Sequence, residues 1–166
     1  MPPVLSVGAD PADLNDDGVV NALDIDTLSI AIGVGASATT YGYMDLNTDG
    51  QIDQADLDEL VLNLVPTTGG GTGTFYGDAN LDGAVDLLDF DILTGNFGSS
   101  GIGWAGGDFT RQNLSPTNPP DFTVDLLDFD ILTANFGAGS PAAVPEPASA
   151  ALLGLAGLTL LRRRHA

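Results

Sequence analysis

The sequence predicts a mainly α-helical protein made of short repeats, in each of which a twelve-residue loop leads into one helix. The pattern Asp-x-Asn-x-Asp-Gly begins at Asp13, Asp45 and Asp78. Apolar residues at helical spacing follow each loop, such as Ile25 and Leu28 after the first. A single loop with a single helix holds little core of its own, so we expect the repeats to fold in pairs.

The composition is strongly acidic but is not that of a disordered tail. Of the 166 residues 23 are acidic and 4 are basic, and the arginine cluster at 162–164 leaves Arg111 alone against all the carboxylates. Hydrophobic residues make up 43%, and every acid except Glu59 and Glu146 is Asp. A solvating segment would mix Glu with Asp, whereas short carboxylates suit tight cation loops. The charge excludes nucleic acid as a direct partner and favours divalent cations.

Three loops carry the ligand spacing of a twelve-residue calcium loop. Oxygen-bearing side chains stand at positions 1, 3, 5, 9 and 12, glycine stands at position 6, and the backbone carbonyl of position 7 adds an oxygen. The predicted ligands are Asp13, Asn15, Asp17, Val19, Asn21 and Asp24 in loop 1, Asp45, Asn47, Asp49, Gln51, Asp53 and Asp56 in loop 2, and Asp78, Asn80, Asp82, Ala84, Asp86 and Asp89 in loop 3. Turn formation and helix capping favour Asp and Asn, but they do not require the same offsets three times.

The number of carboxylates ranks the three sites. Loop 1 offers three and loops 2 and 3 offer four each, so we expect loop 1 to bind calcium most weakly. All three have Asp at position 12, where the common EF-hand has Glu, and the shorter side chain must draw the helix start toward the ion. Without metal the crowded carboxylates repel, so folding should be coupled to calcium binding.

The helices follow the loops in order. The first is expected over residues 25–32 and the second from Leu57 to Leu64, ended by Pro66. The segment 124–137 repeats 85–98 except for Ala134 in place of Gly95, which indicates an internal duplication and a fourth repeat.

The loop of the fourth repeat is irregular. Asp125 and Asp128 hold its positions 9 and 12. One alignment counts back without a gap, which puts Asp121 at position 5 and Phe122 in place of the turn glycine. A second alignment puts Asp108 at position 1, with an insertion over about residues 111–120. We expect this fourth site to be weak, irregular or empty, which gives about three calcium ions per chain.

Composition divides the chain into modules. The stretch 66–74 contains only Pro, Thr and Gly, which is typical of a flexible linker. We expect one module of two repeats over residues 10–65 and a second over residues 75–137. A further linker over 138–143 leads to a terminal segment over 144–166.

Paired loop-and-helix repeats that carry Asp at position 12 resemble the type I dockerin domain, here over residues 13–64 and again over 78–136. The resemblance implies a non-catalytic calcium-dependent module, in which helix residues near positions 10 and 11 contact a cohesin partner. That family often has Ser-Thr there, whereas this chain has Ala22-Leu23, Gln54-Ala55, Leu87-Leu88 and Leu126-Leu127. The departure speaks against the usual cohesin partner, and the leucine pairs are explained more simply as core residues.

The sequence offers no catalytic group. Its one histidine is His165, there is no cysteine, and no base is available to activate a serine or threonine. Most of the carboxylates are accounted for by the calcium loops. We therefore expect the chain not to be an enzyme.

The C-terminal segment has three parts in order: Val144, Pro145, Glu146 and Pro147, then an apolar run over 148–161, then Arg162, Arg163 and Arg164. This order resembles a PEP-CTERM sorting signal. The resemblance implies a hydrophobic helix inserted transiently in the membrane, processing by an exosortase in the bacterial cell envelope, and delivery to the cell surface or the extracellular polysaccharide matrix. Export requires a signal peptide, and none is visible at the N-terminus, so we expect an upstream segment to be missing from this sequence.

Two functions follow. The first is a calcium-dependent docking or structural protein of the envelope or matrix, whose partner is a cohesin-like or other surface protein. The alternative is the accessory C-terminal part of a secreted polysaccharide-degrading enzyme, a glycoside hydrolase whose catalytic domain precedes this chain. A cytosolic calcium buffer is a third reading, which would require the terminal segment to be accidental.

Overall fold

The computed structural model describes residues 10–110 and 123–139, and the fold is given for these ranges. They contain helices and two isolated β-bridges, Pro66 with Thr72 and Ser100 with Thr123, but no strand. The helices in chain order are α1 (Ala22–Gly33), α2 (Ala38–Tyr41), η1 (Gly42–Met44), α3 (Gln54–Glu59), η2 (Leu60–Leu64), α4 (Leu87–Asn96), η3 (Trp104–Gly106) and α5 (Leu126–Asn135). The prediction of a mainly helical protein is confirmed.

In each of the four repeats the helix starts at position 10 of the loop. The position 9 side chain accepts the backbone N–H of position 11, and the position 12 carboxylate accepts the N–H of position 9. This reciprocal capping box satisfies N–H groups that would otherwise be left free at a helix start. The same residues that the calcium pattern picks out therefore also fix where each helix begins.

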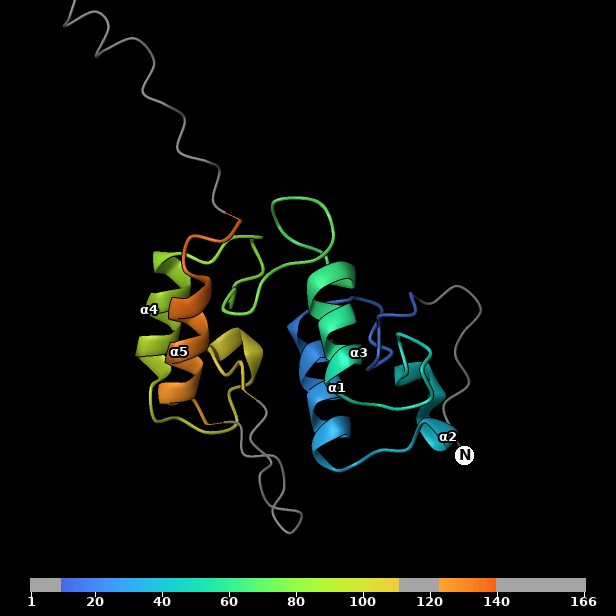
Figure 1. Cartoon of the computed structure of the whole chain (residues 1–166). Helices are drawn as coiled ribbons and strands as arrows, with labels where there is room; N and C mark the ends of the chain where they lie inside the picture. The colour runs from blue at the N-terminus through green and yellow to red at the C-terminus, as the bar shows by residue number, and fades with distance from the viewer. Residues whose placement is uncertain (1–9, 111–122, 140–166) are drawn as a thin grey trace, which may run out of the picture.

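The first two repeats pack α1 against α3, as Figure 1 shows. Ile25 and Leu28 of α1 meet Leu57 of α3 in the core. After α3 the helix widens into the π-helical turn η2, in which Val65 N–H donates to the Leu60 carbonyl (2.9 Å). Pro66 follows, as predicted.

The last two repeats pack α4 against α5 through reciprocal contacts (Figure 1). Val85 N–H donates to the Ala138 carbonyl (2.9 Å), and Val124 N–H donates to the Ser99 carbonyl (3.0 Å). These two bonds are related by the same offset that relates the duplicated sequences. Phe90 and Phe129 meet edge to face with ring centroids 6.1 Å apart. The duplication is therefore visible as a symmetric pair of repeats.

Trp104 in η3 joins the two pairs. Its backbone N–H donates to Asp26 Oδ1 on α1 (2.8 Å), and its indole N–H donates to the carbonyl of Asp78 in loop 3 (2.7 Å). Its ring also packs against Phe109, with centroids 5.1 Å apart. The buried apolar residues of the described chain form one cluster that includes both pairs.

The stretch 66–74 is attached to both pairs by hydrogen bonds. Thr74 N–H donates to the Val61 carbonyl (2.8 Å) and Thr68 N–H donates to the Leu81 carbonyl (2.8 Å). Composition indicates a flexible linker here, but glycine and threonine also suit a tight turn, and the partners of these N–H groups lie outside the stretch. The division into two modules stays a prediction.

The predicted C-terminal helix over 144–166 lies outside the described residues, as does most of the linker before it. Within residues 10–110 and 123–139, no helix has the length and apolarity needed to cross a membrane.

Candidate metal centres

Loops 1, 2 and 3 hold their first carboxylate in the same way. The position 1 side chains are Asp13, Asp45 and Asp78. Each accepts the backbone N–H groups of positions 5 and 6, at 2.8–3.2 Å in all three loops. Asp78 also accepts the hydroxyl of the buried Thr74. The loop backbone thus turns around this carboxylate.

The position 12 carboxylate closes each loop. Asp24, Asp56 and Asp89 have no exposed surface. One oxygen accepts the N–H groups of positions 2 and 3 and the other accepts that of position 9, at 2.8–3.3 Å. Burial raises the pKa of Asp24 and of Asp89, and the accepted N–H bonds partly offset the rise. These three side chains tie the start of the helix to the start of the loop.

Backbone angles show that the three loops share one geometry. The position 6 glycines, Gly18, Gly50 and Gly83, have φ of 91°, 91° and 92°. Position 4 is also left-handed in each loop, although it holds Asp16, Thr48 or Leu81, at φ 59°, 61° and 55°. Leucine is disfavoured at such an angle, so the loop geometry overrides the preference of the residue at this position.

The donor set of these loops fits calcium. In each loop the position 3 amide donates to the position 5 carboxylate, at 3.0–3.2 Å, which holds two predicted ligands side by side. Within the described residues no group of three or more His, Cys, Asp or Glu side chains is placed closely enough to hold a metal ion by itself. The loop oxygens accept N–H bonds from their own backbone, but each carboxylate keeps at least one oxygen that accepts no more than one hydrogen bond. Hard oxygens in this number are what calcium requires.

Loop 1 differs at position 9. Its Asn21 side-chain amide donates to the Val19 carbonyl (3.2 Å), which is the predicted position 7 ligand. Loops 2 and 3 have Asp at this position, and a carboxylate cannot donate such a bond. The bond occupies an oxygen that calcium would use, which supports the expectation that loop 1 is the weakest of the three sites.

The structure decides the register of loop 4. Asp128 Oδ1 accepts the N–H groups of Phe109 (2.7 Å) and Thr110 (2.8 Å), and its Oδ2 accepts that of Asp125 (2.9 Å). In loops 1 to 3 these donors are positions 2, 3 and 9. Phe109 and Thr110 therefore hold positions 2 and 3, and Asp108 holds position 1. These bonds favour the alignment that starts at Asp108, while Asp121 and Phe122, on which the gap-free alignment rests, lie outside the described residues.

Asp108 differs from the other position 1 residues in its surroundings. Its side chain is 4% exposed, and neither oxygen has a hydrogen-bond partner. Burial, together with the charges of Asp128, Asp26 and Asp125, raises its pKa to about 8. Thr110 N–H offsets this slightly, although its hydrogen bond goes to Asp128. In the sequence Asp108 starts only one of two possible alignments of loop 4, and no pattern there points to Asp26, which comes from α1.

The leucine pairs at positions 10 and 11 are exposed. Leu87 and Leu126 are 67% and 69% exposed, and Leu88 and Leu127 are also exposed. The interpretation of these pairs as core residues is wrong. The core contact of each helix is made further along, by the fully buried Leu93 of α4 and Leu132 of α5.

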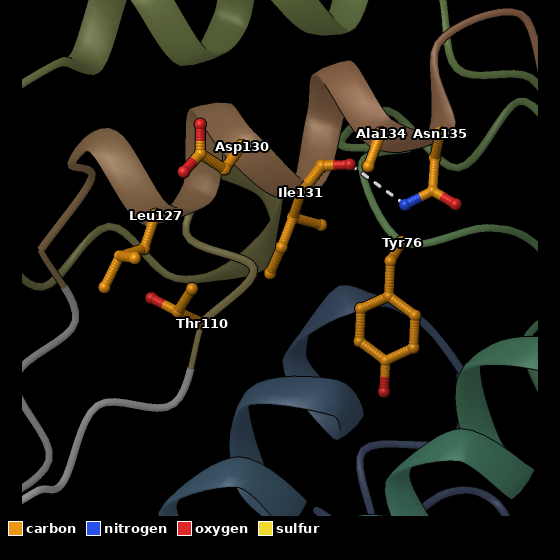
Figure 2. A pocket seen from close by; sticks show the side chains of 7 residues that line it. All are labelled: Tyr76, Thr110, Leu127, Asp130, Ile131, Ala134 and Asn135. Atoms are coloured by element: carbon orange, nitrogen blue, oxygen red, sulfur yellow. Dashed lines mark hydrogen bonds between the residues drawn. The ribbon is translucent and has the colours of Figure 1, made fainter.

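An open pocket of about 450 Å³ lies beside one of these leucines. Figure 2 shows it between α5 and Tyr76, with Leu127 and Ile131 directed into it. Tyr76 donates its hydroxyl to Asp58 Oδ1 (2.7 Å), so its ring is held in place. The pocket is mostly apolar and can take a side chain from a partner.

Comparison with protein families gives one match. The model of the dockerin type I domain matches residues 11–65 and again residues 43–98. The two matches share loop 2, which is paired once with loop 1 and once with loop 3, and together they span residues 11–98, which is more than half of the 166 residues. Comparison with curated proteins and with solved structures gives no match. Loop 4 lies beyond the matched residues.

Proposed function

We propose, from the premise that this chain belongs to the type I dockerin family, that loops 1, 2 and 3 each bind calcium and that the loaded helices dock a partner protein. Type I dockerin domains are calcium-binding docking modules that use EF-hand-like loops and typically bind cohesin domains. The observation that carries the proposal is the recurrence of one loop geometry three times, down to the left-handed angle at position 4.

Calcium would act here as a folding ligand. Each loop gathers carboxylates that repel one another when no cation is bound. Calcium relieves this repulsion, so its binding free energy contributes to the free energy of folding. At 100 times its dissociation constant, one bound ion adds about 2.7 kcal/mol. Three ions would dominate the stability of a domain of this size.

The proposed docking surface is formed by the leucine pairs Leu87-Leu88 and Leu126-Leu127. Reciprocal packing of α4 and α5 presents two copies of the same apolar pair. Exposed leucines in such number favour a partner with an apolar surface, rather than one that recognises Ser-Thr hydroxyls. We therefore expect a cohesin-like or other surface protein with an apolar binding face.

Calcium titration tests the core of the proposal. We expect at least three ions per chain by calorimetry, together with a rise in helical circular dichroism as calcium is added to chelator-treated protein. Unchanged helicity on chelation, with no binding at millimolar calcium, would contradict it.

We further propose that residues 144–166 sort the protein to the bacterial cell envelope. The support is the order of the Val-Pro-Glu-Pro motif, the apolar run and the arginine cluster. Export followed by exosortase processing would leave the acidic repeats outside the cell, in the surface or matrix. Fractionation of cells that express the full chain tests this, with a version lacking residues 144–166 as control. An uncleaved protein in the cytosolic fraction would overturn the sorting proposal and leave calcium docking untouched.

The alternative places this chain at the end of a secreted polysaccharide-degrading enzyme. Dockerin domains are non-catalytic, so any glycoside hydrolase activity would reside upstream. Genomic sequence before residue 1 separates the two readings. An in-frame hydrolase domain supports the alternative, and a signal peptide directly before the first loop supports a stand-alone docking protein.

A further inference from the structure

We propose that Asp108, Asp125 and Asp128 form a fourth calcium site, next to Asp26 of α1. This goes beyond the proposed function, which needs only loops 1 to 3. The site lies outside the residues matched by the dockerin model and draws on two repeat pairs.

The first argument is register. Asp128 accepts N–H groups from loop positions 2, 3 and 9 in the same way as Asp89 does in loop 3. Asp108 therefore stands where Asp78 stands, at the residue from which a calcium loop starts. The first and last residues of loop 4 therefore correspond to those of loop 3.

The second argument is the unsatisfied carboxylate. A buried polar group without a hydrogen bond is costly, and a buried charge is more so. In loops 1 to 3 the position 1 carboxylate accepts two N–H groups of the turn, whereas both oxygens of Asp108 are buried and unpartnered. A divalent cation supplies what they lack, because it binds carboxylate oxygens directly and cancels their charge.

The third argument is the gathering of charge. Asp128, Asp26 and Asp125 all act on Asp108 electrostatically. Asp26 uses one oxygen to accept the Trp104 N–H, and its side chain is half-buried. Asp108 and Asp128 are buried and Asp26 and Asp125 are half-buried, so their charges repel unless a cation lies among them.

Neither in this site nor in loops 1 to 3 do three or more acidic side chains of the described residues already lie closely enough to hold a metal ion. The dockerin model nevertheless covers loops 1 to 3, so this finding does not distinguish the fourth site from them. Loop 4 offers fewer oxygens from the described residues, with Thr110 in place of Asn at position 3. We therefore expect calcium to bind here more weakly than in loops 2 and 3.

A cation at this site would reinforce the junction between the repeat pairs. Phe109, at position 2 of loop 4, packs against Trp104, which is bonded to both Asp26 and Asp78. Trp104 is the single tryptophan of the chain and is buried. Its emission can therefore report binding at loop 4.

The test uses the full chain and calcium alone. Asp108→Asn removes the charge with little change of shape, and Asp130→Asn, at an exposed residue of α5, is the matched loss of one charge. Calorimetry should count four ions for the parent and for Asp130→Asn, and three for Asp108→Asn. The change of Trp104 emission that accompanies binding of the fourth calcium ion should disappear in Asp108→Asn only. An equal number of ions in all three proteins overturns the proposal.

Thermal melts keep the test decisive. Without calcium, Asp108→Asn should melt higher than the parent, because the parent must either bury an unpartnered charge or take up a proton on folding. With saturating calcium the order should reverse. An Asp108→Asn variant that melts higher in both conditions means that the carboxylate binds no ion.

A second variant, Asp26→Asn, keeps the acceptor for the Trp104 N–H. It should lower the affinity for the fourth ion only, roughly tenfold, which is the effect of losing one neighbouring partner. Retention of the first three ions in every variant separates this test from that of the proposed function.

Discussion

Loops 3 and 4 lead into helices of nearly the same sequence, α4 and α5, but the first carboxylates of the two loops differ in their hydrogen-bond partners. Asp78 is held by two backbone N–H groups and a threonine hydroxyl, whereas Asp108 has no partner. Both helices nevertheless begin with the same capping box. The comparison shows that the capping residues at positions 9 and 12 start the helix in both loops. Hydrogen bonds to the position 1 carboxylate come from the N–H groups of the glycine turn, which loop 3 has.

The largest effect should come from removing the carboxylate that closes loop 3. Asp89→Ala leaves three buried N–H groups without an acceptor. We expect the free energy of unfolding in calcium to fall by about 3–5 kcal/mol, as for a broken buried charge network, with the loss of one ion. Urea denaturation with parallel calorimetry measures both. The same change at Asp128 should cost less if loop 4 binds its ion more weakly, and an equal cost would remove the difference between the loops.

The second effect concerns pH in the absence of calcium. The folded-state pKa of Asp108, about 8, lies above its ordinary value of 3.8, so between these values the folded chain binds more protons than the unfolded chain. Stability should therefore be highest at low pH and fall as pH rises, with a limiting slope of about 1.4 kcal/mol per unit. Chemical denaturation at pH 5 and pH 8 in chelator tests this. Asp108→Asn should lose most of the slope, and a parent with none would show that Asp108 ionises at its ordinary pKa in the folded chain.

The third effect compares the two leucine pairs as docking surfaces. Replacing Leu87 and Leu88 by Ser and Thr, or Leu126 and Leu127 likewise, should change the free energy of unfolding by less than about 0.5 kcal/mol per residue, since these side chains are exposed. Binding of a cohesin-type partner, measured by calorimetry in calcium, should weaken by about 1–3 kcal/mol for the pair that is engaged. The pair whose loss leaves binding unchanged is not part of the docking surface. Unchanged binding in both variants would remove the proposed surface.

The smallest effect tests the one difference between the repeated segments. Gly95 lies in α4 with no atom within contact of an added Cβ, and α5 has Ala134 at this place. Gly95→Ala should stabilise the protein by about 0.4–1 kcal/mol, because alanine loses less backbone freedom on folding. Thermal unfolding with calcium measures it. A destabilised variant would show that this position of α4 is not equivalent to that of α5.

Much of the site was accessible from sequence because its contacts are local. The residues that the calcium pattern picked out as ligands include those whose side chains accept N–H groups in loops 1 to 3, since donor and acceptor lie within one twelve-residue loop. The helix starts were fixed by the same residues. Composition was less informative for residues 66–74, because glycine and threonine suit both a flexible linker and a hydrogen-bonded turn.

By itself the sequence determined three loops with calcium-type ligands and the duplication of α4 in α5, whereas α1 and α3 begin at Ala22 and Gln54, ahead of the expected Ile25 and Leu57. Tertiary structure alone decided that Asp108 begins loop 4, that Asp26 lies near it, and that the leucine pairs face solvent. Spacing along the chain is enough for contacts within one loop. The register across an insertion, the approach of α1 and the exposure of a helix face depend on which elements pack together, and that is set by residues distant in sequence such as Trp104.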